Sequence, residues 1–122
     1  DRFKSVNDVY GHLLGDRVLQ SVANILRSLS GSHDMACRLG GDEFCLLLKA
    51  HSRDEMLRYA DFVVSTALAL QQMQPTPPLI TTLSVGACLV DPTREWNDWY
   101  AQADQALYRA KSVGGNRVEW QD

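Results

Sequence analysis

No part of this sequence constrains the fold more than residues 38–44, which read Arg-Leu-Gly-Gly-Asp-Glu-Phe. They lie between two apolar runs, 35–39 and 44–48, that have the composition of short buried strands. The glycine-rich polar stretch between the runs predicts a β-hairpin, because glycine accepts positive φ at a tight turn. Asp42 and Glu43 would then project together from one edge of a sheet. Paired carboxylates suit a divalent metal or a general base, but Gly and Asp are equally common in an ordinary polar turn.

Hydrophobic periodicity predicts the other elements of the chain. Apolar residues at helical spacing predict helices over 3–10, 18–29, 56–68 and 96–110, and β-branched or apolar runs predict strands over 79–90 and 117–120. The resulting order is helix, helix, hairpin, helix, strand, helix, strand. That order predicts an α+β fold, an α/β sandwich in which helices cover a mixed sheet.

Local signals mark where several of these elements begin and end. Gly11 and Gly15 bracket a predicted loop, after which Asp16 stands at the N-cap position of the second helix. Ser52 fits the N-cap of a capping box, since a Glu follows three residues later. Gly86 lies inside the long strand and indicates either a bulge or the close approach of another backbone.

Length and charge limit the class of protein. The 122 residues fit one domain, which we expect to span 1–122. A net charge of -3 excludes the basic surface that nucleic acid or an anionic membrane requires, and no apolar run could span a bilayer. The polar opening Asp1–Lys4 has no lead-in, which indicates an N-terminally truncated piece of a longer protein.

The three cysteines, Cys37, Cys45 and Cys88, lie in apolar, strand-like runs. Their odd number and the lack of CxxC spacing argue against a disulfide framework or a zinc site. Cysteines in such runs are usually small core residues. We therefore expect a reduced, cytoplasmic domain that contacts neither nucleic acid nor a membrane directly.

Several polar residues are hard to explain as plain surface. Lys4, Asn7, His12 and Asp16 crowd the first segment, and Lys111 ends the last long helix beside Gly-Gly. Lysines at such places can hold phosphate oxygens, and Asn and Asp side chains together can read the polar edge of guanine. Each residue also has an ordinary explanation. Asp16 can cap a helix, His12 can be a loop or core histidine, and Lys111 suits the helix dipole.

Three linked blocks of sequence carry a resemblance to a known family. The blocks are Phe-Lys-x-x-Asn-Asp-x-x-Gly-His-x-x-Gly-Asp-x-x-Leu at 3–19, Arg-x-Gly-Gly-Asp-Glu-Phe at 38–44, and Ala-Asp-x-Ala-Leu-Tyr-x-Ala-Lys at 103–111 with Asn-Arg at 116–117. Together they resemble the GGDEF domain of diguanylate cyclases, over nearly the whole chain and in the right order.

This resemblance implies a fold similar to the nucleotide-cyclase palm, with a central mixed sheet of about five strands, surrounding helices and a truncated first strand. It implies a reaction that joins two GTP molecules into cyclic di-GMP and releases pyrophosphate. The reaction takes place in a homodimer in which each domain binds one GTP. The resemblance also implies Mg²⁺ or Mn²⁺ as cofactor, and sensory or regulatory domains elsewhere in the parent protein.

The site residues of the family match positions of this chain one by one. By resemblance, Asp42 would bind the metal and act as, or help place, the base on the attacking 3′-hydroxyl, and Glu43 would support the metal site. Gly40 and Gly41 would let the backbone approach the nucleotide. The other implied contacts with GTP are Asn7 and Asp16 with guanine, Leu19 packing nearby, His12 in a loop over the nucleotide, and Phe3, Lys4 and Lys111 with the phosphates.

Three departures from the family pattern bear on activity. A further metal-binding Asp belongs two residues before the position of Asp1; this sequence starts too late to show it, and we expect the metal site to be complete in the parent protein. The inhibitory product site, Arg-x-x-Asp, is degenerate, because Gly31 stands at the Arg position although Asp34 is present. We therefore expect no product inhibition through this site. Gly115 replaces an Arg that contacts phosphate, and Arg117 could compensate only in part.

These observations leave two functions in competition. The first is an active diguanylate cyclase, which the intact signature at 40–44 favours. The alternative is a catalytically weak or silent GTP-binding domain that regulates a neighbouring domain such as a phosphodiesterase. Gly115 and the Asp missing before Asp1 favour this alternative. A pure dimerisation module is disfavoured by the retained pair of guanine-reading residues.

Overall fold

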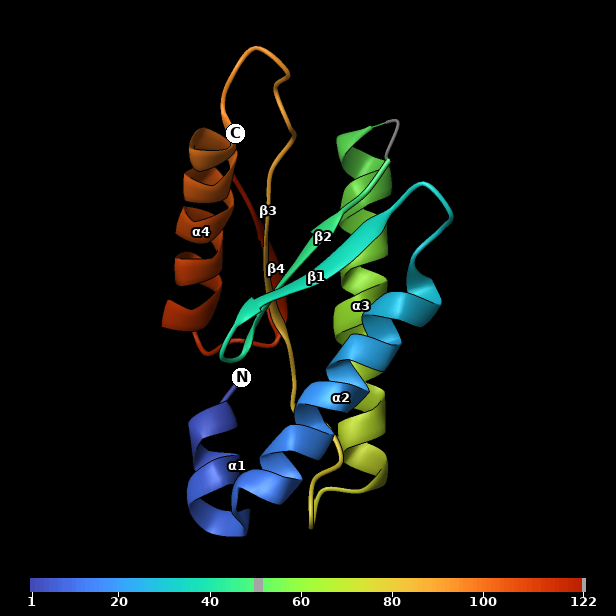
Figure 1. The fold of residues 1–122 in the computed structure, drawn as a ribbon, viewed down its shortest axis with the longest axis vertical. Helices are drawn as coiled ribbons and strands as arrows, with labels where there is room; N and C mark the ends of the chain where they lie inside the picture. Colours follow the sequence, from blue (N-terminus) through green and yellow to red (C-terminus); the bar gives the residue numbers. More distant parts are fainter. Residues whose placement is uncertain (50–51, 122) are drawn as a thin grey trace.

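The computed structural model describes residues 1–49 and 52–121. Its helices are α1 (Phe3–Tyr10), α2 (His12–Leu29), α3 (Arg53–Met73) and α4 (Trp96–Ser112), and its strands are β1 (Met35–Gly40), β2 (Glu43–Leu47), β3 (Ser84–Ala87) and β4 (Arg117–Trp120). The predicted order of helices and strands is confirmed. Figure 1 shows α3 and α4 on opposite sides of the strands, with the β1–β2 hairpin crossing in front of β3.

The strands form two small sheets. β1 pairs antiparallel with β2, and β3 pairs parallel with β4. The predicted α+β fold is confirmed, but the four strands of the described residues do not form one continuous sheet of about five. Within this part of the chain β2 and β3 are not paired with each other. The hairpin reaches the core through the side chains of Phe44 and Leu46 instead.

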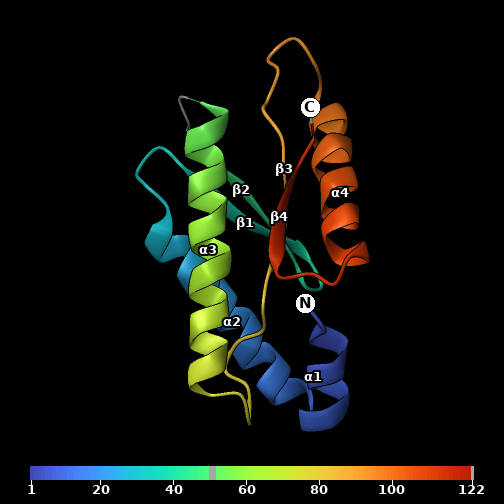
Figure 2. The same ribbon diagram turned by 180° about the vertical axis from the view of Figure 1, so that it is seen from behind.

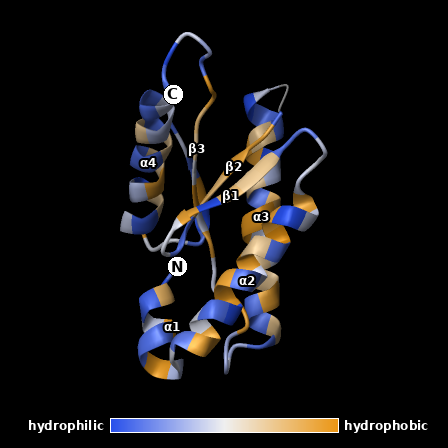
Figure 3. Ribbon diagram, in the orientation of Figure 1, coloured by the Kyte–Doolittle hydropathy of each residue, from blue (hydrophilic) through white to orange (hydrophobic). Residues whose placement is uncertain are grey.

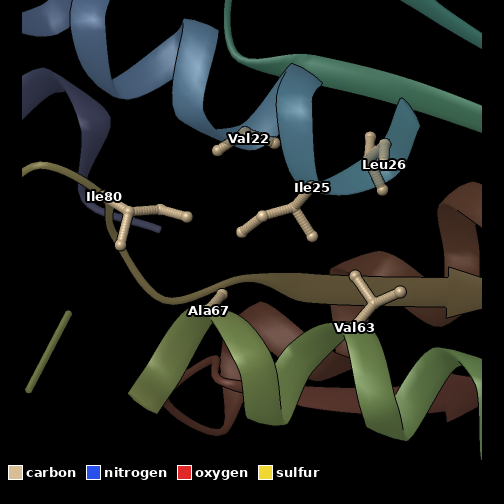
Figure 4. Packing of buried hydrophobic residues seen from close by; sticks show 6 residues of the cluster. All are labelled: Val22, Ile25, Leu26, Val63, Ala67 and Ile80. Carbon is tan, nitrogen blue, oxygen red and sulfur yellow. The ribbon is translucent and has the colours of Figure 1, made fainter. Parts of the chain in front are cut away.

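The main core lies between α2 and α3. Apolar residues recur every three or four positions, which gives each helix one buried face. Tyr59 of α3 also donates a hydrogen bond from its hydroxyl to the carbonyl oxygen of Leu29, at 2.7 Å. Burying one Val, Leu or Ile side chain stabilises a fold by about 1.5–3 kcal/mol, so this layer fixes α2 against α3. The cluster in Figure 4 consists of Val22, Ile25, Leu26, Val63, Ala67 and Ile80.

Helix α4 packs directly on β3 because Gly86 has no side chain. A Cβ at Gly86 would lie 2.1 Å from the carbonyl oxygen of Ala103 and 2.3 Å from the backbone nitrogen of Leu107. Ala106 and Ala110 on the same helix are fully buried. The predicted close approach at Gly86 is confirmed, and Figure 2 shows α4 beside β3 and β4 from behind.

The predicted loop between Gly11 and Gly15 is wrong, because α2 begins at His12 and Gly15 is a buried helical residue. Gly11, with φ of 89°, is the break between α1 and α2. Gly15 lies against α1 instead, since a Cβ there would be 1.8 Å from Asn7 Oδ1. Asp16 is consequently an exposed residue inside α2 and not its N-cap.

The start of α3 agrees with the sequence prediction, whereas the length of β3 does not. At the start of α3 the Ser52 hydroxyl accepts a hydrogen bond from the Glu55 backbone nitrogen at 3.1 Å, which confirms the predicted cap. The strand predicted over 79–90 is shorter than expected. It runs only from Ser84 to Ala87, because its partner β4 has four residues and the pairing ends with it. No helix of the described residues is long and apolar enough to cross a membrane.

The hairpin strands are less buried than the sequence predicts. All six residues of β1 are exposed, because β1 has a partner on one edge only and β2 makes the core contacts. Cys37 is therefore exposed, and Cys45 and Cys88 are only half-buried, so the prediction of three core cysteines is wrong. Figure 3 shows that both strands nevertheless carry hydrophobic residues.

Candidate active site

The hairpin turn has a backbone that needs its two glycines. Gly40 has φ of 144° and Gly41 has φ of 53°, values that residues with a side chain disfavour. Leu39 is the extra residue of a bulge between Arg38 and Gly40. Apart from chain neighbours, no atom of the described residues lies within 4 Å of a Cβ position at either glycine. The space around the turn is therefore open to a ligand.

Arg38 holds this turn from the first strand. Its Nε and one terminal guanidinium nitrogen donate to the Gly41 carbonyl oxygen at 2.9 and 2.6 Å. The planar guanidinium group makes two such bonds in a fixed geometry, which limits rotation of the turn. Arg38 belongs to the sequence signature, but its contact with Gly41 could not be deduced from the spacing of residues.

The two carboxylates of the turn have different surroundings. Asp42 is an exposed residue of the turn itself, and Glu43 is the first residue of β2. Glu43 Oε2 accepts a hydrogen bond from the Tyr100 hydroxyl of α4 at 3.2 Å. The negative charge of Glu43 raises the pKa of Tyr100, so the phenol keeps its proton and remains a donor. Tyr100 thus connects the hairpin to α4.

Asp1 ties the start of α1 to the strands behind the turn. Its carboxylate accepts hydrogen bonds from Thr82 Oγ1 at 3.0 Å, Ser84 Oγ at 2.6 Å and the Asn116 backbone N–H at 2.9 Å. These three donors come from the segment around β3 and from the turn before β4. They anchor the first turn of α1, which contains Phe3.

Lys111 and the hairpin turn lie at this same end of the molecule. Lys111, at the end of α4, lines one groove together with Asp1. Figures 1 and 2 show the turn of the β1–β2 hairpin beside the start of the chain and the end of α4. Phe3 and Lys4 form the first turn of α1, directly after Asp1. The structure therefore brings together four of the predicted site residues at one end of the molecule.

Gly115, at which the family resemblance often implies an Arg, lies beside the anchor. It has φ of 77°, and a Cβ there would be 2.8 Å from Asp1 Oδ2. A side chain at this position would be strained and would crowd the Asp1 carboxylate. The local structure of the chain is thus adapted to glycine, and a simple Gly115→Arg change would not restore the missing cation without cost.

Asn7 lies at the contact between α1 and α2. Its Oδ1 atom is buried against Gly15 and has no hydrogen-bond partner among the described residues. A buried amide oxygen without a partner costs about 1–3 kcal/mol, so it is a group that a polar ligand can satisfy. His12 is exposed at the first position of α2, not in a loop.

Two of the predicted nucleotide contacts, Asp16 and Leu19, line a groove between α2 and β1. Its volume is about 650 Å³, and Arg38 also lines it. Lys111 and Asp1 line a separate groove of about 800 Å³. The structure therefore does not bring the predicted guanine contacts and the predicted phosphate contacts into one cavity.

Asp34 also lines the first groove, but its carboxylate already has two partners. Oδ1 accepts from the backbone nitrogen of Lys49 at 2.9 Å, and Oδ2 accepts from that of Gly31 at 2.6 Å. These bonds, first that of Lys49 and then that of Gly31, lower the pKa of Asp34. Asp34 joins the end of α2 to the end of β2, so its side chain has a structural use.

The carboxylates of the turn fit a metal that binds together with a nucleotide. Asp42 and Glu43 offer the oxygen ligands that Mg²⁺ and Mn²⁺ prefer. No group of three or more His, Cys, Asp or Glu side chains in the described part of the chain could hold a metal ion. Mg²⁺ is commonly held by one or two carboxylates plus substrate phosphates. The donor set suits that arrangement and not an ion held by the protein alone.

Three contacts of this site were missed by sequence reasoning. They involve Arg38 on the turn, Tyr100 on Glu43, and Asp1 as an anchor. Tyr100 occurs in a helical apolar stripe, which predicts packing rather than a hydrogen bond to a carboxylate. Each contact either joins residues far apart in the chain or depends on the exact backbone path of a turn. The local spacing of residues in the sequence determines neither of these.

Comparison with known proteins identifies the family of this chain. The sequence profile of the diguanylate cyclase GGDEF domain matches residues 1–117. The chain belongs to the GGDEF domain family. This GGDEF domain is 37% identical over 118 residues to diguanylate cyclase DgcM of Escherichia coli, and 36% identical over 119 residues to diguanylate cyclase DgcP of Pseudomonas aeruginosa. The matches cover 97% and 98% of the chain but only 28% and 18% of the two relatives.

Solved structures of GGDEF domains have the same fold. The GGDEF domain of DgcB from Caulobacter crescentus, in complex with c-di-GMP, aligns with a TM-score of 0.87 at 28% identity, over 98% of this chain and 72% of that one. The active GGEEF domain of a Vibrio cholerae diguanylate cyclase aligns with a TM-score of 0.86 at 29% identity, over 100% and 78%. The resemblance seen in the three sequence blocks is confirmed.

Proposed function

We propose that this GGDEF domain catalyses the joining of two GTP molecules into cyclic di-GMP, with release of pyrophosphate. The observation that carries the proposal is the intact hairpin turn with its exposed Asp42, which lies beside the start of the chain and the end of α4. Relatives that are 36–37% identical over nearly the whole chain are diguanylate cyclases, which supports the same activity.

GTP recognition is assigned to residues of α1 and α2. The Asn7 amide, whose Oδ1 has no hydrogen-bond partner among the described residues, and the carboxylate of Asp16 would bind the polar edge of guanine, with Leu19 packing against the base. The phosphates would lie at the first turn of α1, where free backbone N–H groups and the side chain of Lys4 favour negative charge. His12, exposed at the start of α2, would lie over the nucleotide.

The chemical step needs little more than placement and neutralisation of charge. The 3′-oxygen of one GTP attacks the α-phosphorus of the other, and the bond to pyrophosphate breaks as the new phosphodiester bond forms. We assign the 3′-hydroxyl proton to Asp42, because an exposed turn carboxylate can approach a bound hydroxyl. Lys111 would neutralise charge on the phosphates. Mg²⁺ or Mn²⁺, held by Asp42 and Glu43, would polarise the phosphoryl group when bound.

Catalysis would require two copies of the domain. One domain is proposed to bind one GTP, whereas cyclic di-GMP contains two guanosine units and two phosphodiester bonds. Two domains facing each other would present each 3′-hydroxyl to the other nucleotide. We propose a homodimer in the cytoplasm, where GTP is available, formed within longer proteins that also carry sensory or regulatory domains.

A second function is favoured by one observation, the glycine at position 115. With no cation at this position and no room for one beside Asp1, the site has fewer positive groups for phosphate. A domain that binds GTP but turns it over slowly could regulate a neighbouring domain instead. Binding and turnover of GTP, measured on the same preparation with ATP as the control nucleotide, separate the two. GTP binding with steady formation of cyclic di-GMP supports the enzyme, and binding without product supports the regulator.

Gly15→Ala is expected to weaken GTP binding about tenfold. The new Cβ would lie 1.8 Å from Asn7 Oδ1, so the Asn7 side chain must turn away from its position. Only the end of one side chain has to move, so we expect the fold to be kept. Isothermal titration calorimetry with GTP measures the effect, with circular dichroism as the check on folding.

A double-variant cycle tests whether the effect acts through Asn7. In an Asn7→Ala background the clash is absent, so adding Gly15→Ala should cause no further loss of GTP affinity. A further loss of the same size in that background would contradict the assignment of guanine binding to Asn7.

Cyclic di-GMP is expected to bind at Asp34 more weakly than about 1 μM, because Gly31 supplies no guanidinium group and the Asp34 carboxylate is already hydrogen-bonded to the backbone. Calorimetry with cyclic di-GMP measures this. Gly31→Arg is the matched gain-of-function variant, since Gly31 has ordinary backbone geometry, and it should bind the product more tightly. Tight binding to the unchanged protein that Asp34→Ala removes would contradict the prediction.

A further inference from the structure

Cys37 and Cys45 face each other across the hairpin. They are direct partners in the β1–β2 register, and both thiols are free. Opposite residues of an antiparallel pair point to the same face, with Cα atoms about 4.5–5.5 Å apart. A disulfide bond accepts Cα separations of about 4.4–6.8 Å. We propose that Cys37 and Cys45 form a modification site, at which a peroxide converts the two thiols into a cross-strand disulfide.

The surroundings of the two thiols give them different roles. Cys37 is exposed on β1, so a peroxide in solution can reach it, whereas Cys45 is half-buried. A peroxide in solution must reach a sulfur atom to oxidise it, so Cys37 is the first thiol to react and Cys45 is the second.

The reaction balances with peroxide as the only oxidant. The Cys37 thiolate attacks one peroxide oxygen, the O–O bond breaks, and a sulfenic acid forms with release of one water. The Cys45 sulfur then attacks the Cys37 sulfur, the S–O bond breaks, and the second water leaves as the S–S bond forms. Two thiols lose two protons and two electrons, and the peroxide is reduced to two waters.

Cys88 is the third cysteine, and it is a less suitable partner. It belongs to another part of the chain, after β3, and its Sγ donates a hydrogen bond to the Trp99 carbonyl oxygen at 3.4 Å. Direct strand pairing holds Cys37 opposite Cys45, whereas no strand pairing holds Cys88 there.

The disulfide between Cys37 and Cys45 would lie next to the hydrogen bonds that hold the hairpin turn. Arg38, which clamps the Gly41 carbonyl, directly follows Cys37 in β1. A covalent bond between the strands would fix their spacing one residue before this clamp. The modification site therefore lies on the same hairpin as Asp42. Formation of the disulfide does not depend on whether Asp42 has the proposed catalytic role.

The test exposes the intact protein under native conditions to hydrogen peroxide, blocks the remaining free thiols with an alkylating reagent, and counts the free thiols among Cys37, Cys45 and Cys88. We expect these to fall from three to one. Trypsin cuts after Arg38, so Cys37 and Cys45 lie on different peptides, 28–38 and 39–49. Mass spectrometry should find these two peptides linked, two hydrogen masses lighter than their sum, and separated by dithiothreitol.

Two serine variants act as controls. Cys88→Ser should retain the linked peptides, whereas Cys37→Ser should retain both of its remaining thiols in free form. Any one of three results would overturn the proposal. These are Cys37, Cys45 and Cys88 all remaining free after treatment, a link between Cys45 and Cys88, or oxygen added to Cys37 without a link to Cys45.

Discussion

Asp42→Ala is expected to lower the rate of cyclic di-GMP formation by at least about 100-fold. The variant removes both the proposed proton acceptor and one of the two carboxylates available to the metal. Product formation from GTP and Mg²⁺, followed by chromatography, measures the effect. Asp42 is exposed in a turn and contributes no side chain to the core, so the free energy of unfolding should change by less than about 0.5 kcal/mol.

Asp61→Ala is the matched control for this variant. Asp61 is an exposed carboxylate on α3, outside the hairpin and both grooves. It carries the same change of charge and size, so it should leave the rate unchanged. Loss of activity in both variants would point to a general effect of charge, and full activity of Asp42→Ala would show that the catalytic role has been assigned to the wrong residue.

Gly86→Ala is expected to destabilise the domain by at least about 2 kcal/mol and to lower its melting temperature by roughly 8 °C. The new Cβ would lie 2.1 Å from the Ala103 carbonyl oxygen and 2.3 Å from the Leu107 nitrogen. Both are backbone atoms of α4, so the whole helix must move away from β3. Thermal and urea unfolding followed by circular dichroism measure the loss.

Gly31→Ala provides the comparison for Gly86→Ala. There the nearest atom to the new Cβ is Asp34 Oδ2 at 3.2 Å, at the end of a side chain that can shift. We expect a stability change of less than about 1 kcal/mol. Equal losses for the two variants would mean that the contact between α4 and β3 is not as close as described.

The two glycines that pack against helices show how far sequence reasoning reaches. Gly86 could be predicted because a glycine inside a strand has few explanations, and close backbone approach is one of them. The sequence predicts the end of a loop at Gly15, whereas the structure places Gly15 inside α2. Spacing does not distinguish a glycine that interrupts a helix from one that packs on a neighbouring helix. The contact with Asn7 of α1 decides the matter, and it is a tertiary contact.

The candidate site could be predicted only as far as the sequence signature extends. The position of Asp42 at the tip of a hairpin followed from two apolar runs around a glycine pair. The hydrogen bond from Tyr100 to Glu43 and the position of the hairpin turn beside the end of α4 join elements far apart in the chain. Such contacts depend on how α4 packs on β3, which local patterns do not determine.

The same limit explains the exposure of β1. An apolar run such as 35–39 predicts a strand but not which partners cover it. Among the described residues β1 pairs with β2 and contributes no side chain to the buried core, so Cys37 is accessible although its neighbours are largely apolar. The accessible thiol opposite Cys45 is thus a property of the fold, and no motif contains it.

The most direct test of the proposed diguanylate cyclase activity is the identity of the nucleotide product that the intact protein forms from GTP and Mg²⁺. We predict cyclic di-GMP, with two molecules of pyrophosphate released for each molecule formed, and no product from ATP or in the presence of a chelator that removes the metal. Bound GTP that stays unchanged over many hours would contradict the catalytic account, and would leave regulation of a neighbouring domain as the function of this chain.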